Sequence, residues 1–211
     1  FKPLADYIHG QGMKFGLHIM RGIYRGAYDA NLPIKGTAYH ARDIADTKST
    51  CGWSNLTYGL NMSHPGAQAY LDSLFDLYAQ WGVDFLKIDD LISPYHAAEI
   101  EGYHKSCKAV KRLMVISGSP GDQTPLEKSD HLRQNMEMFR ITKDQWDCWN
   151  DILIQFDRAA HWAPYCGKGC WADLDALPFG RFFDIAGLQG SKKVVSTRLS
   201  QDEIRTDMTL H

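Results

Sequence analysis

Two adjacent carboxylates follow an apolar segment near the middle of the chain. Residues 81–90 read WGVDFLKIDD, in which residues 83–88 predict a buried strand that ends at Asp89 and Asp90. At the carboxyl end of a strand, a carboxylate can act as a nucleophile, a general base or a metal ligand. Lys87 interrupts the apolar run close to this end, where a side chain that faces inward would point into a pocket. The alternative interpretation is that both aspartates cap the turn that follows.

Two further acidic segments lie near the ends of predicted strands. Arg140 ends one strand, and Asp144 begins the predicted next helix, so that Asp144 could instead be a helix N-cap. Asp173 and Asp175 lie near the end of another strand, where the alternative is ordinary turn chemistry. In a (β/α) barrel the carboxyl ends of the strands meet on one face, so these side chains would converge with Asp89. Two carboxylates beside aromatic side chains are the equipment for breaking a glycosidic bond.

Predicted strands alternate with predicted helices along most of the chain. Short apolar runs predict strands at residues 13–20, 83–88, 113–117, 135–141 and 169–174. Helical spacing predicts helices at residues 1–12, from Ser63 or His64 onward, at residues 96–112 and at residues 144–161, and residues 21–62 predict a long loop.

This alternation favours an α/β fold with a parallel sheet, arranged either as a (β/α) barrel or as a doubly wound open sheet. No G-x-G-x-x-G motif follows a predicted strand, as a Rossmann-type open sheet would require. Polar residues at the strand ends favour the barrel, and about four strand–helix units predict an incomplete (β/α)8 TIM barrel.

The composition is that of a soluble globular protein. The chain has 211 residues and a formal net charge of −2, and its Lys and Arg residues are scattered, so it lacks the basic surface that nucleic-acid binding requires. Its apolar runs are shorter than the roughly 18 residues of a membrane-spanning helix. Five cysteines are an odd number for a complete disulfide framework, and Cys166 and Cys170 lack the second Cys/His pair of a zinc site. We expect small buried or loop thiols, with at most one local disulfide.

The ordered motifs resemble those of glycoside hydrolase family 27, the α-galactosidases and α-N-acetylgalactosaminidases of the melibiase group. Residues 81–90 resemble the family's W-G-V-D-x-L-K-[YFI]-D, residues 140–144 its R-x-x-x-D, and residues 171–175 its W-N-D-P-D. Residues 4–17 are similar to L-A-x-Y-V-H-x-x-G-L-K-x-G-I, and residues 200–210 look like the helix that enters the final barrel repeat. The resemblance therefore runs from one end of the chain to the other.

The resemblance implies a retaining glycosidase that cleaves a terminal α-linked galactose or N-acetylgalactosamine by double displacement. It makes Asp89 the nucleophile and Asp144 the general acid/base, with Lys87, Arg140 and Asp175 as sugar-binding residues. It implies neither a metal nor an organic cofactor. The implied partner is an α-galactoside or α-N-acetylgalactosaminide substrate, rather than a nucleic acid or a membrane.

The sequence departs from the family pattern at several places. The strands with the family's W-D-D pair would precede Phe1, and the last strand and a C-terminal β-sandwich would follow His211. We therefore expect residues 1–211 to be one partial barrel domain that is inactive by itself. Leu91 stands where members have a cysteine, and residues 117–121 read SGSPG instead of C-[ES]-W-P. This loop leaves galactose and N-acetylgalactosamine as equal alternatives.

Two other function classes fit the same residues. The chain could belong to a non-catalytic carbohydrate-binding barrel, although a binding site has no need for the pair Asp89 and Asp144. It could also belong to a metal-dependent barrel enzyme that uses Asp89, Asp90 and a histidine, for which His18 is the natural candidate.

Overall fold

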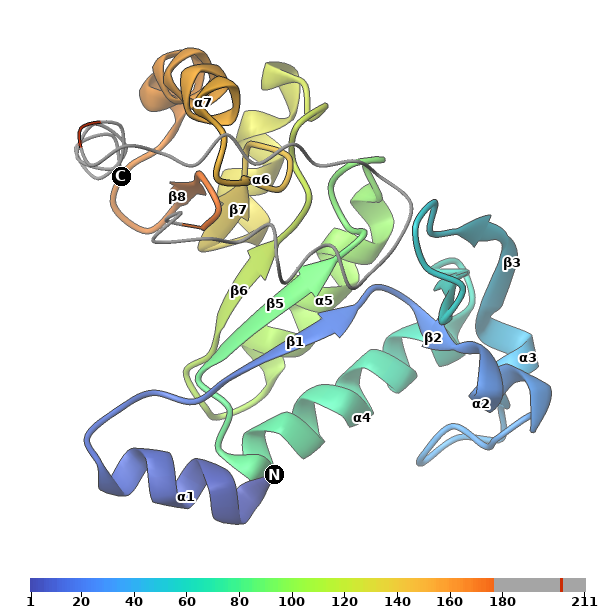
Figure 1. Cartoon of the computed structure of the whole chain (residues 1–211). Helices are drawn as coiled ribbons and strands as arrows, with labels where there is room; N and C mark the ends of the chain where they lie inside the picture. Colours follow the sequence, from blue (N-terminus) through green and yellow to red (C-terminus); the bar gives the residue numbers. More distant parts are fainter. Residues whose placement is uncertain (177–201, 203–211) are drawn as a thin grey trace.

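A parallel five-stranded sheet forms the centre of the computed structural model, which describes residues 1–176 and 202 (Figure 1). The spatial order is β1-β5-β6-β7-β8, so each strand pairs with the next one of this sheet along the chain. These strands are β1 (Gly16–Met20), β5 (Phe85–Asp89), β6 (Val115–Gly118), β7 (Met138–Arg140) and β8 (Trp171–Asp173). Each ends within one residue of a strand predicted from the sequence, and the predicted α/β class with a parallel sheet is confirmed.

Helices connect the consecutive strands of this sheet (Figure 1). They are α1 (Lys2–Gly10) before β1, α4 (Pro65–Trp81), α5 (Ala97–Ala109), α6 (Ser129–Asn135) and α7 (Trp149–Trp162), with the short 3-10 helices η1 (Leu126–Lys128) and η2 (Ala163–Tyr165). Helix α4 starts where the sequence predicts: the His64 ring accepts a hydrogen bond from the N–H of Gly66. It ends at Gly82, whose φ of 84° is a left-handed conformation that glycine adopts without strain.

Residues 21–62, predicted as one long loop, contain a second sheet. Three strands pair antiparallel in the order β2-β4-β3, and two short helices accompany them. The elements are β2 (Ile23–Tyr24), α2 (Arg25–Asp29), α3 (Ala41–Ile44), β3 (Ala45–Thr50) and β4 (Thr57–Leu60). The prediction was wrong because these strands are short and β3, with the sequence ADTKST, has no alternating apolar face.

Helix α7 starts five residues later than the predicted start at Asp144. The amides of Gln145 and Trp146 donate instead to the carboxylates of Asp175 and Asp151, at 2.7 Å and 3.1 Å. Because these N–H groups are bound by side chains, the segment before α7 is a loop, and Asp144 is not an N-cap. The helix predicted at residues 200–210 lies, apart from residue 202, outside the described residues.

Strand β5 separates the hydrophobic core from a more open face. Leu86 and Ile88 are fully buried in the core that the strand shares with α4 and α5, whereas Phe85, Lys87 and Asp89 are partly exposed. This alternation follows from the two-residue period of a strand. Burial of each large aliphatic side chain stabilises the fold by about 1.5–3 kcal/mol, which fixes the face on which Asp89 lies.

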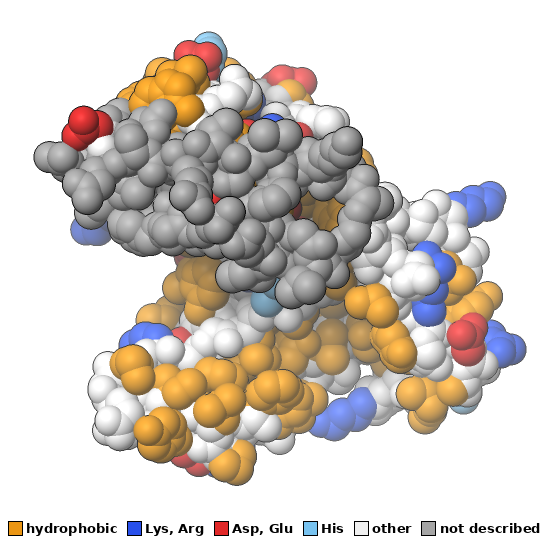
Figure 2. Space-filling model, viewed as in Figure 1, with side chains coloured by type: hydrophobic (Ala, Val, Ile, Leu, Met, Phe, Trp, Pro, Cys, Tyr) orange, Lys and Arg blue, Asp and Glu red, His pale blue; other side chains and the backbone are white. Residues whose placement is uncertain are grey.

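The outer surface shows no concentration of one charge on the face drawn in Figure 2, where Lys and Arg side chains are scattered. Hydrophobic side chains gather over α1 on the same face, and Phe1, Leu4 and Tyr7 are exposed there. Within the part of the chain that the structure describes, every helix is too short or too polar to cross a membrane.

A partly buried carboxylate joins the amino ends of β1 and β5. Asp84 accepts hydrogen bonds from the Phe15 N–H at 2.9 Å and from the Arg112 guanidinium at 2.6 Å, and it lies 2.7 Å from the His9 ring. Burial by itself would raise the pKa of Asp84, but these partners outweigh burial and lower the pKa below its ordinary value of 3.8. Asp84 therefore stabilises this end of the sheet.

We predict that Asp84→Asn lowers the free energy of unfolding of the full-length protein by about 1–3 kcal/mol at pH 7. Because the native state lowers the pKa of Asp84, its contribution is complete above the ordinary carboxyl pKa and is lost as the pH falls through the lowered value. The difference between variant and wild type should therefore shrink below about pH 4. Denaturant titrations of variant and wild type at pH 7 and at a pH below about 4 measure this difference in the free energy of unfolding. Asp6→Asn is the control, because the exposed pair of Asp6 with Lys2 stabilises little; equal effects of the two substitutions would contradict the prediction.

Candidate active site

The carboxyl end of the parallel sheet brings together the residues predicted from the sequence. Asp89 is the last residue of β5, Arg140 is the last residue of β7, and Asp175 follows the end of β8 by two residues. Only β6 lies between β5 and β7. The strand register thus places side chains that are far apart in the sequence at one edge of the sheet.

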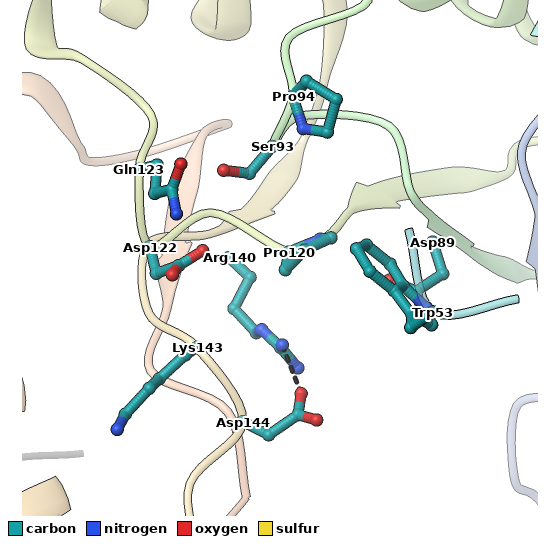
Figure 3. A pocket seen from close by; sticks show the side chains of 10 residues that line it. All are labelled: Trp53, Asp89, Ser93, Pro94, Pro120, Asp122, Gln123, Arg140, Lys143 and Asp144. Atoms are coloured by element: carbon teal, nitrogen blue, oxygen red, sulfur yellow. Dashed lines mark hydrogen bonds and ion pairs between the residues drawn. The ribbon is translucent and has the colours of Figure 1, made fainter. Parts of the chain in front are cut away.

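A cavity of about 530 Å³ opens at this edge (Figure 3). Asp89 and Asp144 both line it, and the dashed line in Figure 3 joins the Arg140 guanidinium to the Asp144 carboxylate. The remaining lining residues come from the loops around the sheet: Trp53, Ser93, Pro94, Pro120, Asp122, Gln123 and Lys143. Two of the five predicted site residues, Lys87 and Asp175, do not line this cavity. Lys87 lies on the same face of β5 as Asp89, two residues before it.

The guanidinium of Arg140 connects the acidic residues of the site. Its Nη2 donates to Asp144 at 2.5 Å, its Nη1 donates to Asp175 at 2.6 Å, and its Nε donates to the carbonyl of Thr142 at 3.1 Å. Burial by itself would lower the pKa of Arg140, but the charges of Asp175, Asp144 and Asp89 outweigh burial and raise it. One permanent cation thus faces three carboxylates that belong to three different segments.

The two carboxylates of the cavity have different environments. Asp144 is 66% exposed and depends on Arg140 for its position. The side chain of Asp89 is only 21% exposed, and its Oδ1 accepts hydrogen bonds from the Ser119 hydroxyl at 2.9 Å and from the Asp90 N–H at 3.1 Å. Its Oδ2 lies 3.7 Å from Nε2 of His18. Asp89 is thus a fixed, partly buried carboxylate, and Asp144 is a solvent-accessible one.

Close backbone packing holds the β6 and β7 loops together beside Arg140. A Cβ atom at Gly121 would overlap the carbonyl oxygen of Arg140, so glycine is required for this approach. Arg158 of α7 then donates to the carbonyls of Ile141 and Gly121, at 2.6 Å and 2.9 Å. These contacts position the loop that carries Pro120 and Asp122 into the cavity.

Asp90, adjacent to Asp89 in the sequence, has a structural role. Its carboxylate is fully buried and pairs with Arg21 at 2.8 Å, and Arg21 also pairs with Glu99 at 2.6 Å. Burial raises the pKa of Glu99 to about 7, although the Arg21 charge opposes this shift. Burial and the same cation lower the pKa of His96 to about 4. The two adjacent aspartates therefore face different environments, and only Asp89 reaches the cavity.

This separation bears on the metal-dependent alternative, which needs Asp89, Asp90 and His18 together. The Asp90 carboxylate is bound to Arg21, so these residues do not form a common ligand set. Among residues 1–176 and 202, no group of three or more His, Cys, Asp or Glu side chains is arranged to hold a metal ion. All five cysteines are free thiols, including Cys166 and Cys170.

Sequence reasoning missed several residues that shape the site. For Asp173 the sequence also allowed ordinary turn chemistry, and this is its role: its carboxylate accepts a hydrogen bond from the N–H of Asp175 at 2.8 Å. Trp53 reaches the cavity from the segment predicted as a loop. It is a single aromatic residue in a Gly- and Asn-rich segment, and its sequence context did not indicate a site residue. Ser119 lies in the segment noted as divergent, but the sequence contains no sign that its hydroxyl faces Asp89.

The chain is similar to glycosidases of one family. The family described as alpha galactosidase A matches residues 51–197. A family 27 β-L-arabinopyranosidase from Geobacillus stearothermophilus, solved as a variant in complex with arabinose, is 45% identical with a TM-score of 0.90; the match covers 100% of this chain and 49% of that one.

Curated relatives are more distant in sequence. An alpha-galactosidase of Oryza sativa is 25% identical over 85% of this chain and 35% of its own length. An alpha-N-acetylgalactosaminidase of Gallus gallus is 25% identical over 86% of this chain and 39% of its own length. The chain thus spans little more than a third of the length of these relatives. The family match covers most of the chain and confirms the resemblance seen in the sequence motifs, so the chain belongs to the alpha galactosidase A family of glycosidases, glycoside hydrolase family 27.

Proposed function

We propose that the full-length protein is a retaining glycosidase that removes a terminal sugar of galactose-like ring configuration. The observation that carries this proposal is that Asp89 and Asp144 line one cavity from two strand ends, with the Arg140 cation bound to Asp144. Two opposed carboxylates are what double displacement at an anomeric carbon requires. The names of the related glycosidases support the same reaction class.

In the first step, Asp89 attacks the anomeric carbon while Asp144 gives its proton to the departing glycosidic oxygen. The product is a glycosyl-enzyme ester on Asp89. In the second step, Asp144 removes a proton from water, and the resulting attack releases the sugar with its original configuration. Arg140, which lines the cavity, binds a sugar hydroxyl in this proposal. Lys87 and Asp175 do not line the cavity, and we propose them as sugar-binding residues from the family resemblance alone. The hydrogen bond from Arg140 also keeps the exposed Asp144 side chain at the cavity.

We also propose that residues 1–211 form one sector of a (β/α)8 barrel. The consecutive order of the five parallel strands fits neighbouring staves of a barrel. The position of the cavity at their carboxyl ends fits the face on which barrel enzymes carry their active sites.

Three sugars are candidates for the group removed. The sequence motifs favour α-galactose or α-N-acetylgalactosamine, and the identity of 45% to a β-L-arabinopyranosidase, against 25% to the rice alpha-galactosidase, favours β-L-arabinopyranose. β-L-Arabinopyranose has the ring configuration of α-D-galactopyranose and lacks only its C6 hydroxymethyl group. The same pair of carboxylates can therefore serve all three sugars, and the choice depends on the cavity wall.

We predict that the full-length enzyme hydrolyses p-nitrophenyl β-L-arabinopyranoside with a kcat/KM at least about tenfold above that for p-nitrophenyl α-D-galactopyranoside. A pocket built for a sugar without C6 excludes the larger one sterically. Initial rates on these two substrates and on the α-N-acetylgalactosaminide give the order. The reverse order would contradict the arabinoside assignment, and binding of all three sugars without hydrolysis would support a carbohydrate-binding protein instead.

The proposed roles predict opposite products in azide rescue. Asp144→Ala should lower kcat/KM about 100- to 10,000-fold for a sugar leaving group, but much less for an aryl glycoside, whose phenolate needs no proton. Azide should accelerate its turnover and give a glycosyl azide of retained configuration. Asp89→Ala should abolish hydrolysis, and azide can give only the inverted product. NMR of the products measures this.

The control for azide rescue is Asp122→Asn, which removes another carboxylate from the same cavity and should show no azide product. An inverted product from Asp144→Ala, or natural-substrate turnover that survives either alanine substitution, would show that the assigned roles are wrong.

We further predict that dialysis of the full-length enzyme against EDTA leaves kcat/KM unchanged, because both proposed steps use carboxylates and water alone. The readout is the rate on the best aryl glycoside before and after chelation. A loss of activity that added divalent cation restores would favour the metal-dependent alternative.

A further inference from the structure

Ser119 is a fully buried residue directly beyond β6 that contacts the proposed nucleophile. Its hydroxyl donates to Oδ1 of Asp89 at 2.9 Å. Two hydrogen bonds fix the backbone of Ser119 to residues on either side of Asp89. The Ser119 N–H donates to the carbonyl of Ile88 at 2.9 Å, and the Ser119 carbonyl accepts from the N–H of Leu91 at 2.9 Å. Ser119 and the end of β5 therefore form one rigid unit.

The two oxygens of Asp89 are not equivalent in this unit. Oδ1 accepts two hydrogen bonds, from the hydroxyl of Ser119 and from the N–H of Asp90. Among the described residues, Oδ2 has no hydrogen-bond partner, and Nε2 of His18 lies 3.7 Å away, beyond hydrogen-bond distance. The lone pairs of Oδ1 are thus used by the protein, and those of Oδ2 are left for a substrate.

The hydrogen bond from Asp90 is itself fixed by the buried ion pairs beneath the site. Asp90 has a φ of 60°, a left-handed conformation that is uncommon for residues other than glycine but that aspartate adopts more often than most. Arg21 holds it there through both the Asp90 carbonyl, at 2.7 Å, and the Asp90 carboxylate. Arg21 thus fixes the residue whose N–H donates to Oδ1 of Asp89 at 3.1 Å.

We propose that Ser119 is a positioning residue that, with the Asp90 N–H, holds Oδ1 of Asp89 and makes Oδ2 the oxygen that attacks the sugar. This inference rests on the proposed function, because it requires Asp89 to be the nucleophile. Oδ2 forms the bond to the anomeric carbon as the glycosidic bond breaks and the leaving oxygen takes the proton of Asp144. Oδ1 becomes the ester carbonyl oxygen, and Ser119 keeps its proton throughout.

The same two donors act in both chemical steps. They favour the ionised carboxylate before attack, and they stabilise the charge that returns to the carboxylate when water releases the sugar. Other titratable groups also face Asp89: His18 from β1, Lys87 from β5 itself, and Arg140 from β7 with its partners Asp144 and Asp175. They are unchanged when only the Ser119 hydroxyl is removed.

The test compares Ser119→Ala, Ser119→Thr and Ser119→Cys in the full-length enzyme with the control Ser106→Ala. Ser106 is also fully buried, and its hydroxyl also donates to a carboxylate, that of Asp72, at 2.6 Å, but it lies on α5 away from the cavity. The control therefore removes the same kind of bond without touching the site. Thermal unfolding of each variant measures the effect on stability alone.

We expect Ser119→Ala to lower kcat/KM on the best aryl glycoside about 10- to 100-fold, as for a lost hydrogen bond to a charged group. The acid limb of its pH profile should move to higher pH, because the ionised carboxylate has lost a donor. Ser119→Thr, which keeps the hydroxyl, should restore both, and Ser119→Cys, a weak donor, should lie between. Ser106→Ala should leave both the rate and the acid limb unchanged.

The inference is overturned if Ser119→Ala keeps both kcat/KM and the acid limb of wild type, or if Ser119→Thr behaves as Ser119→Ala does. Should Ser119→Ala fail to fold, the near-isosteric Ser119→Cys decides the question by the same two readouts. Asp89→Ala separates the two proposals. If this variant retains hydrolysis, the proposed function is wrong. If it is inactive while Ser119→Ala has the kcat/KM and acid limb of the wild type, only the role of Ser119 is contradicted.

Discussion

The guanidinium of Arg140 is the interaction on which the acidic side of the site depends. It is buried at the end of β7, and it holds Asp144 and Asp175 through separate nitrogens at 2.5 Å and 2.6 Å. Three carboxylates close to one another would repel, and a fixed cation among them offsets that repulsion. The side chains of Arg140 and Asp175 are only 5% and 16% exposed, so removing either one leaves a largely buried charge without its partner, which is destabilising. Arg140 therefore positions Asp144 and offsets the negative charge of the carboxylates in the pocket.

A second buried cation, Arg21, holds two carboxylates beneath β5. It binds Asp90 and Glu99 and so fixes the backbone directly after Asp89. The two aspartates that end β5 thus divide two tasks: Asp90 faces inward to the ion pairs, and Asp89 faces the cavity. Together the two arginines leave Asp89 rigid and partly buried and Asp144 exposed at the same cavity.

The sequence predicted those parts of the molecule that follow from local pattern. Apolar runs placed all five parallel strands, and the adjacency of strand ends then placed Asp89 and Arg140 at one edge. The sequence could not tell which of Asp89 and Asp90 faces the cavity, because that depends on the φ of Asp90 and on Arg21, 69 positions away in the chain. Nor could it find Trp53, which reaches the cavity from a segment without an apolar period, or the hydroxyl of Ser119, whose partner lies 30 positions away.

If Asp89 is the nucleophile, it forms a covalent bond to the sugar that can be isolated. In Asp144→Ala the second step lacks its base, so an activated aryl glycoside should load the enzyme faster than water unloads it. Mass spectrometry of the quenched protein should then show one added glycosyl group, and peptide mapping should place it on Asp89. A glycosyl group on a different residue, or turnover with inverted product and no adduct, would contradict the account.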